Sequence, residues 1–263
     1  MKGPAGVMAL VLAETAAGGA AFLFLTPLWS EVKRGFFYLT GSVVLALALS
    51  TAGAANAARD PAAGGHERLA AVLALSLAGV TFAWLVLMLF RLVIVPRLVG
   101  VLSVPLAVAM LVAFARTLDR STSLSAVQLI AGAIFTGAVL DGLLLGHWYL
   151  TDRRLTRGPI DRMAWALIGA VVLEAAAVIA GGFGAPAVSA AADTTLSPIL
   201  TQANVASWIA IGMVGITGLI AAFIRLTLRG SRPTAVQSAT GFFYLAVITA
   251  FTAELAAKVR FLH

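Results

Sequence analysis

Eight apolar runs, each about as long as a bilayer-crossing helix, dominate the sequence. A helix that crosses the hydrocarbon core needs about 20 mostly apolar residues. Hydrophobic residues make up 61% of the chain and charged residues only 11%, whereas about a quarter of a soluble domain is charged. The sequence therefore predicts an all-α integral membrane protein with eight transmembrane helices and short loops. The runs cover residues 5–27, 36–57, 69–90, 94–115, 126–150, 163–183, 205–227 and 236–257.

The basic residues are divided unevenly between the two ends of these predicted helices. With eight spans, both termini lie on the same side as the second, fourth and sixth loops. Eleven of the 18 Lys and Arg residues belong instead to the odd-numbered loops: Lys33, Arg34, Arg91, Arg97, Arg153, Arg154, Arg157, Arg162, Arg225, Arg229 and Arg232. Because cytoplasmic loops carry the excess of Lys and Arg, we expect the odd loops in the cytoplasm and both termini outside it. The expected location is the inner membrane of a prokaryotic-type cell, and the net charge of +7 is attributed to topology rather than to nucleic-acid binding.

Segments of the chain resemble each other at a spacing of about half its length. Residues 22–27 (FLFLTP) resemble 147–152 (HWYLTD), and residues 39–45 (LTGSVVL) resemble 167–173 (LIGAVVL). This similarity predicts one membrane domain built from two four-helix repeats. Because four is even, both repeats would enter the membrane from the same side as parallel repeats. The repeats would comprise residues 1–120 and 121–263.

Four acidic residues lie within the predicted spans: Glu14, Asp141, Glu174 and Glu254. A charged residue at the centre of a spanning helix costs about 2.5 to 3.5 kcal/mol on the insertion scale, so such residues are functional candidates. We expect Glu14, Asp141 and Glu174 to transfer protons, with the first two at nearly equivalent places in the two repeats. The alternative is a neutral carboxyl group that hydrogen-bonds between helices. Glu254 can also pair with Lys258, four residues further along its helix.

The densest polar cluster is residues 146–154 (GHWYLTDRR), at the end of the fifth predicted helix. His147 can change protonation state near neutral pH, and the neighbouring aromatic rings offer flat apolar faces with one donor each. A quinone headgroup needs a donor to its carbonyl oxygen, aromatic walls and a route for protons. We therefore predict a quinone site formed by His147, Trp148, Tyr149 and Arg153. The alternative is that these aromatic and basic residues anchor the helix at the membrane interface.

Several chemistries are not supported by any residue pattern in the chain. There is no Cys, which excludes thiolate metal sites, Cys-ligated iron-sulfur clusters and cysteine nucleophiles. His66 and His263 fall in a loop and at the terminus, so haem held by two intramembrane histidines is not expected, while methionine ligation stays open. No catalytic residue and no metal site is predicted, because no phosphate-loop, H-E-x-x-H or aspartate-rich motif is present.

The opening helix contains the small-residue run 14–22 (ETAAGGAAF). This run, together with the duplicated four-helix layout, resembles the polysulfide-reductase-type (NrfD-like) membrane anchors. The resemblance implies a haem-free membrane subunit of a respiratory oxidoreductase complex, which docks to an iron-sulfur subunit and exchanges electrons with quinone. Only the region around Glu14 carries over from that family, and the run at 146–150 does not match it.

These observations together predict an integral membrane subunit of a respiratory or electron-transfer complex that interacts with quinone and conducts protons. It would be at most a non-catalytic or quinone-site subunit of an oxidoreductase. Since the chain has no evident redox centre, an iron-sulfur or cytochrome partner subunit would have to supply the electrons. Two other functions remain open: a proton-coupled secondary transporter, and a structural membrane anchor whose acids only hold helices together.

Overall fold

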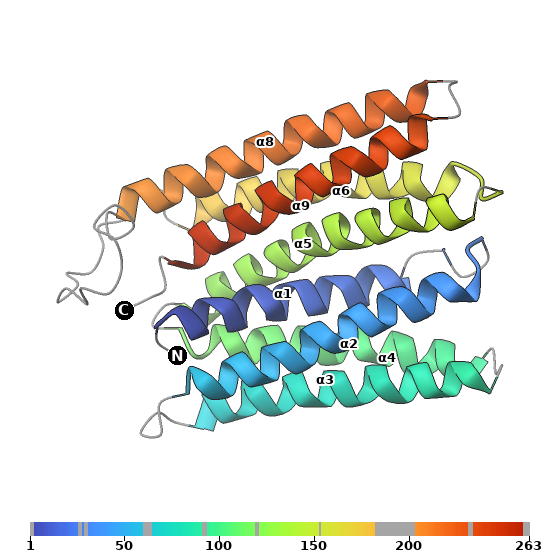
Figure 1. The fold of residues 1–263 in the computed structure, drawn as a ribbon. Helices are drawn as coiled ribbons and strands as arrows, with labels where there is room; N and C mark the ends of the chain where they lie inside the picture. The colour runs from blue at the N-terminus through green and yellow to red at the C-terminus, as the bar shows by residue number, and fades with distance from the viewer. Residues whose placement is uncertain are drawn as a thin grey trace.

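The structure is a computed structural model, and it describes residues 3–25, 28, 31–59, 65–90, 94–118, 121–152, 154–181, 203–230 and 234–259. Within these residues the regular elements are eight long α-helices, without strands (Figure 1). All eight are long and apolar enough to cross a membrane, so the chain is a multi-pass membrane protein of the all-α class. The helices are α1 (Gly3–Leu25), α2 (Arg34–Ala57), α3 (Gly65–Leu89), α4 (Ile94–Ala115), α5 (Thr122–Thr151), α6 (Gly158–Ala180), α8 (Ala203–Arg229) and α9 (Ala235–Val259).

Every predicted span is confirmed as a helix, but three helices begin a full turn or more before the apolar runs. Helices α3, α5 and α6 start four or five residues before the predicted 69, 126 and 163. Their first turns carry polar residues, and α6 also has a proline there, which the first helical turn tolerates. These helices therefore extend beyond the apolar segment into the polar interface, where hydropathy gives no signal.

The helices form two four-helix units that meet along α1 and α5 (Figure 1). In the first unit α1 packs on α2 and α4, while α3 lies between α2 and α4. The second unit repeats this order, with α5 packing on α6 and α9 and with α8 between them. The two units thus have the same connectivity, which the predicted repeat requires. Descent from a duplicated sequence stays a prediction.

Helices α1 and α5 approach each other closely because glycines face one another across their contact. A methyl group added to Gly18 would lie 2.8 Å from the Cα atom of Gly137, and it would also clash with the backbone of Ala133. Gly142 and Gly146 likewise leave room on α5 for Phe243 and Thr240 of α9. Small residues allow spanning helices to pack at short distance. Helix α5 is consequently in close contact with both α1 and α9.

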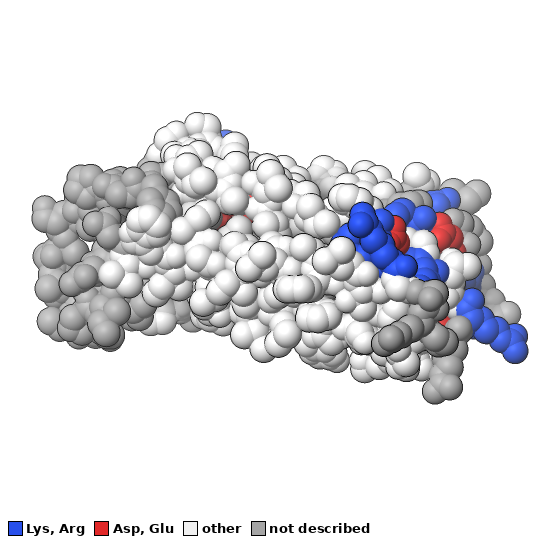
Figure 2. Space-filling model, turned by 90° about the horizontal axis from the view of Figure 1, so that it is seen from above, with Lys and Arg blue, Asp and Glu red and all other residues white. Residues whose placement is uncertain are grey.

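Charged side chains gather at one end of the molecule, where the odd-numbered loops lie (right in Figure 2). Lys33 pairs with Asp152 at 2.9 Å, and Arg162 pairs with Glu31 at 2.7 Å. Both ion pairs join the segment between α1 and α2 to the segment around the start of α6. The hydrogen bond from Lys33 holds the pKa of Asp152 below its usual value. The charges therefore connect the two four-helix units at this end.

Candidate functional site

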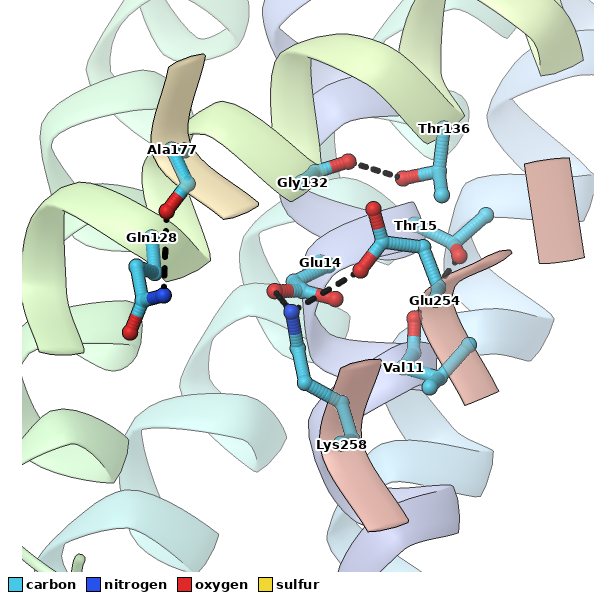
Figure 3. Close-up of polar contacts among 9 residues, drawn as sticks. All are labelled: Val11, Glu14, Thr15, Gln128, Gly132, Thr136, Ala177, Glu254 and Lys258. Carbon is cyan, nitrogen blue, oxygen red and sulfur yellow. Dashed lines mark hydrogen bonds and ion pairs between the residues drawn. The ribbon is translucent and has the colours of Figure 1, made fainter. Parts of the chain in front are cut away.

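One basic and two acidic side chains meet in the interior of the helix bundle (Figure 3). The ammonium of Lys258 lies 2.7 Å from Oε1 of Glu14 and 2.8 Å from Oε2 of Glu254. The two glutamates are fully buried and Lys258 is only 2% exposed. We call these three residues the buried ion cluster. The predicted pairing of Glu254 with Lys258 is confirmed, and Glu14 is added to it.

The members of the cluster come from two helices, and a glycine of a third helix leaves room for them. Glu254 and Lys258 are one helical turn apart on α9, and side chains on a helix lean towards its N-terminus, so the lysine can reach back towards Glu254. Glu14 comes from α1. Gly132 of α5 supplies the space, because a methyl group there would lie 2.6 Å from Oε1 of Glu14 and 3.0 Å from Oε2 of Glu254. An alanine at this place would displace the carboxylates.

The cluster contains more negative than positive groups. Lys258 supplies one positive charge against the two carboxyl groups that contact it. Within the described part of the chain, Oε2 of Glu14 and Oε1 of Glu254 accept no hydrogen bond. Glu174 on α6 is 2% exposed and lies within electrostatic range of both Glu14 and Lys258. The structure therefore places two of the predicted proton-transfer residues, Glu14 and Glu174, in one electrostatic environment.

Polar side chains of α5 lie near the cluster but are bound to backbone carbonyls (Figure 3). The side-chain nitrogen of Gln128 donates to the carbonyl of Ala177 on α6 over 3.1 Å. Thr136 donates to the carbonyl of Gly132 over 2.8 Å, within its own helix. Among the residues that the structure describes, Oε1 of Gln128 has no hydrogen-bond partner and is buried. This region of α5 is therefore polar and partly unsatisfied.

The third predicted proton-transfer residue, Asp141, lies apart from the cluster. It is fully buried on α5, and neither carboxyl oxygen has a hydrogen-bond partner in the described ranges. A methyl group on Gly19 of α1 would lie 3.9 Å from its Oδ2 atom. Glu14 is level with Gly132, nine residues before Asp141, which corresponds to about 13 Å along α5. The two carboxyl groups are therefore offset along the contact between α1 and α5, and the equivalence of Glu14 and Asp141 in two repeats stays a prediction.

The predicted quinone residues are only partly brought together. His147 is exposed at the surface of α5, and its Nδ1 atom lies 3.5 Å from the hydroxyl of Tyr244 on α9. Trp148 is half-buried against Gly35 of α2. Tyr149 is buried, and its hydroxyl donates to the backbone carbonyl of Thr156, so this donor is already engaged. Arg153 lies outside the described residues.

Two residues of these sites were not singled out by the sequence. Lys258 lies near the end of the last apolar run, where a basic residue is expected to be a topology signal at the interface, yet it is buried. The sequence signal for an ion pair was its position four residues after Glu254. Tyr244 was missed because no sequence pattern pairs it with His147. No set of three His, Cys, Asp or Glu side chains that could hold a metal occurs within the described ranges.

Comparisons of the chain with family models, with curated proteins and with solved structures gave no match. The resemblance to the polysulfide-reductase-type anchors therefore stays a prediction.

Proposed function

We propose that the chain is an integral membrane subunit of a respiratory or electron-transfer complex, in which buried acids supply or remove protons for a quinone bound at the odd-loop end. The observation that carries this proposal is the series of ionisable groups along α5. The buried ion cluster lies beside Gly132, Asp141 is buried nine residues further on, and His147 is at the surface after another six. These steps correspond to about 13 and 9 Å of helix rise.

The region around His147 supports a quinone because it combines exposure with donors. The histidine and the Tyr244 hydroxyl lie side by side on the outer surface of the helices, where a lipid-soluble molecule has access. Either group can donate a hydrogen bond to a quinone oxygen. Trp148, the next residue of α5, is half-buried, and its ring contacts Gly35 of α2. We therefore revise the proposed quinone residues to His147, Tyr244 and Trp148, with Tyr149 as structural support.

The electrons in this proposal come from a partner subunit that carries an iron-sulfur cluster or a haem. The inner membrane of a prokaryotic-type cell is the proposed location, with the odd loops in the cytoplasm. A partner on that side would meet the charged end of the molecule shown in Figure 2.

Quinone content of the native assembly tests the proposal whatever the electron donor is. The chain is purified with its native partners, and bound quinone is extracted and counted per chain. We expect quinone and a redox subunit to copurify. His147→Ala and Tyr244→Phe should each lower quinone occupancy up to about tenfold, since tenfold is about 1.4 kcal/mol, the scale of one hydrogen bond. Trp208→Ala, which removes an exposed aromatic ring from α8, should leave occupancy unchanged.

A proton-coupled carrier is the second candidate. It is favoured by one observation, namely that the Glu14–Lys258 ion pair joins the two four-helix units. Alternating access would require these units to move against each other, whereas the glycine contact between α1 and α5 holds them at close distance. A chain that purifies without quinone and without a redox subunit, and that drives proton-linked flux in vesicles, would replace the first proposal with this one.

A further inference from the structure

The buried ion cluster has a charge imbalance that the ion pairs alone do not remove. Two carboxylates and one ammonium carry a net charge of −1 if all three groups are ionised. All three are buried, and an unbalanced charge in a low-dielectric interior is costly unless a counter-ion or a proton neutralises it. Glu174 is also buried, and its ionisation would only enlarge the deficit of positive charge.

No other charged group among the described residues supplies the missing positive charge. Arg59 after α2, Arg68 at the start of α3 and Arg116 after α4 lie at the end of the molecule nearer the cluster, and all three are exposed. Helix α5 carries His147 and Tyr149 near its odd-loop end. Its other ionisable residue is Asp141, which is an acid and supplies no positive charge. The compensation must therefore come from inside the cluster. The remaining basic residues of the helices packed against α1, α9 or α6 belong to the odd-loop end: Arg34, Arg97, Arg225 and Arg229.

We propose that Glu14 and Glu254 share one proton, and that Lys258 fixes this number at one. In this state the ammonium pairs with one carboxylate while the other carboxyl group holds the proton, so the cluster is neutral. Gly132 leaves the two carboxyl groups close enough to the same ammonium for the proton to reside on either. Lys258 is thus a positioning residue, which sets the number of protons held by the two glutamates. The group that donates or accepts the proton is Glu14 or Glu254.

This inference deepens the proposed function, because proton transfer to a quinone requires a group that can hold a proton inside the membrane. It assigns that task to a site in which Glu254 and Lys258 take part beside Glu14. The cluster lies towards the end of α9, at the end of the molecule opposite to His147. Asp141 then lies between the stored proton and the quinone surface.

The proton count can be measured by infrared spectroscopy on the full-length chain in lipid nanodiscs at neutral pH. A protonated carboxyl group has a C=O stretching band that a carboxylate lacks, and the band shifts in heavy water. We expect Glu14→Gln and Glu254→Gln each to reduce the integrated band by one carboxyl group, since the remaining carboxylate and Lys258 then balance each other. Lys258→Met should increase the band by one, because both glutamates must then be protonated. Asp161→Asn, which removes a partly exposed acid of α6, should leave the band unchanged.

The inference is overturned if both glutamine variants retain the full band, or if Lys258→Met leaves it unchanged. Should Lys258→Met fail to fold, the two glutamine variants, which keep the size of the side chain, decide the question. A different result would overturn the proposed function. Absence of quinone from the native assembly rejects it, whereas the proton count in the isolated chain does not depend on quinone.

Discussion

Lys258 is the residue whose environment differs most from what its place in the chain suggests. A lysine near the end of a spanning helix usually extends its long side chain towards the headgroups, where the ammonium is hydrated. Here the side chain turns into the bundle and contacts two buried carboxyl groups. Breaking a buried ion pair by removing one partner is strongly destabilising, because the other charge is left without compensation. The local arrangement therefore depends on all three members of the buried ion cluster.

At the odd-loop end, the ion pair between Lys33 and Asp152 predicts a pH-dependent contribution to stability. The pKa of Asp152 is lowered in the folded protein, so its contribution is present above the ordinary aspartate value of about 4 and is lost as the pH falls through the lowered value. We expect Lys33→Gln to lower the thermal midpoint at pH 6. The deficit should shrink steadily below about pH 4.

Thermal unfolding of both proteins in detergent across this pH range provides the measurement. The exposed Arg97→Gln variant of α4 serves as the control for loss of a basic residue at the same end. A deficit of Lys33→Gln that is equally large at all pH values would show that the ion pair is not its cause.

At the level of helices, the contact between α1 and α5 depends on the absence of side chains. The space that a methyl group on Gly18 would need is already filled by the backbone of α5, which cannot move aside as a flexible side chain could. In such a contact, van der Waals packing between backbones replaces the hydrophobic effect, which does not drive helix association within lipid. The register of this contact also determines which residues of α5 meet Glu14.

Gly18→Ala should therefore destabilise the protein, although alanine is the better helix former by about 0.8 to 1.0 kcal/mol. Gly79→Ala on α3 is the matched control, because nothing lies within 4 Å of the added methyl group. We expect the control to retain or raise the thermal midpoint of the monodisperse protein and Gly18→Ala to lower it. Equal midpoints for the two variants would contradict the close approach of α1 and α5.

The spans could be predicted from the sequence because length and hydropathy alone decide whether a segment crosses a bilayer. The ion cluster could be predicted only in part. The spacing of Glu254 and Lys258 is local and readable, whereas Glu14 joins them through the packing of α1 against α5 and α9, which no local pattern encodes. The same reason explains why the sequence indicates His147 without Tyr244.

For the molecule as a whole, the unequal distribution of charge defines two chemically different ends. Among the described residues, the odd-loop end carries the ion pairs Lys33–Asp152 and Arg162–Glu31, while Lys258, a basic residue near the opposite end, is removed from the surface by burial. The burial of Lys258 increases the difference between the two ends. The cytoplasmic location proposed for the odd loops is the one that the positive-inside rule favours for such a distribution.

This orientation can be tested directly because the chain has no cysteine. Single cysteines are introduced at the exposed positions His66, at the start of α3, and Arg229, at the end of α8. A membrane-impermeant maleimide should label His66→Cys in intact cells and Arg229→Cys only after the membrane is permeabilised. The reverse labelling pattern would place the odd loops outside.

The ion pair between α1 and α9 also has a consequence for biogenesis. Glu14 enters the membrane with the first of the described helices, and Lys258 arrives with the last of them. During translation the glutamate therefore has to remain neutral, or be shielded by lipid headgroups or an insertion chaperone, until its counter-ion is delivered. Nascent chains interrupted before α9 would expose an unmatched acid, which is a feature that membrane quality-control proteases can recognise.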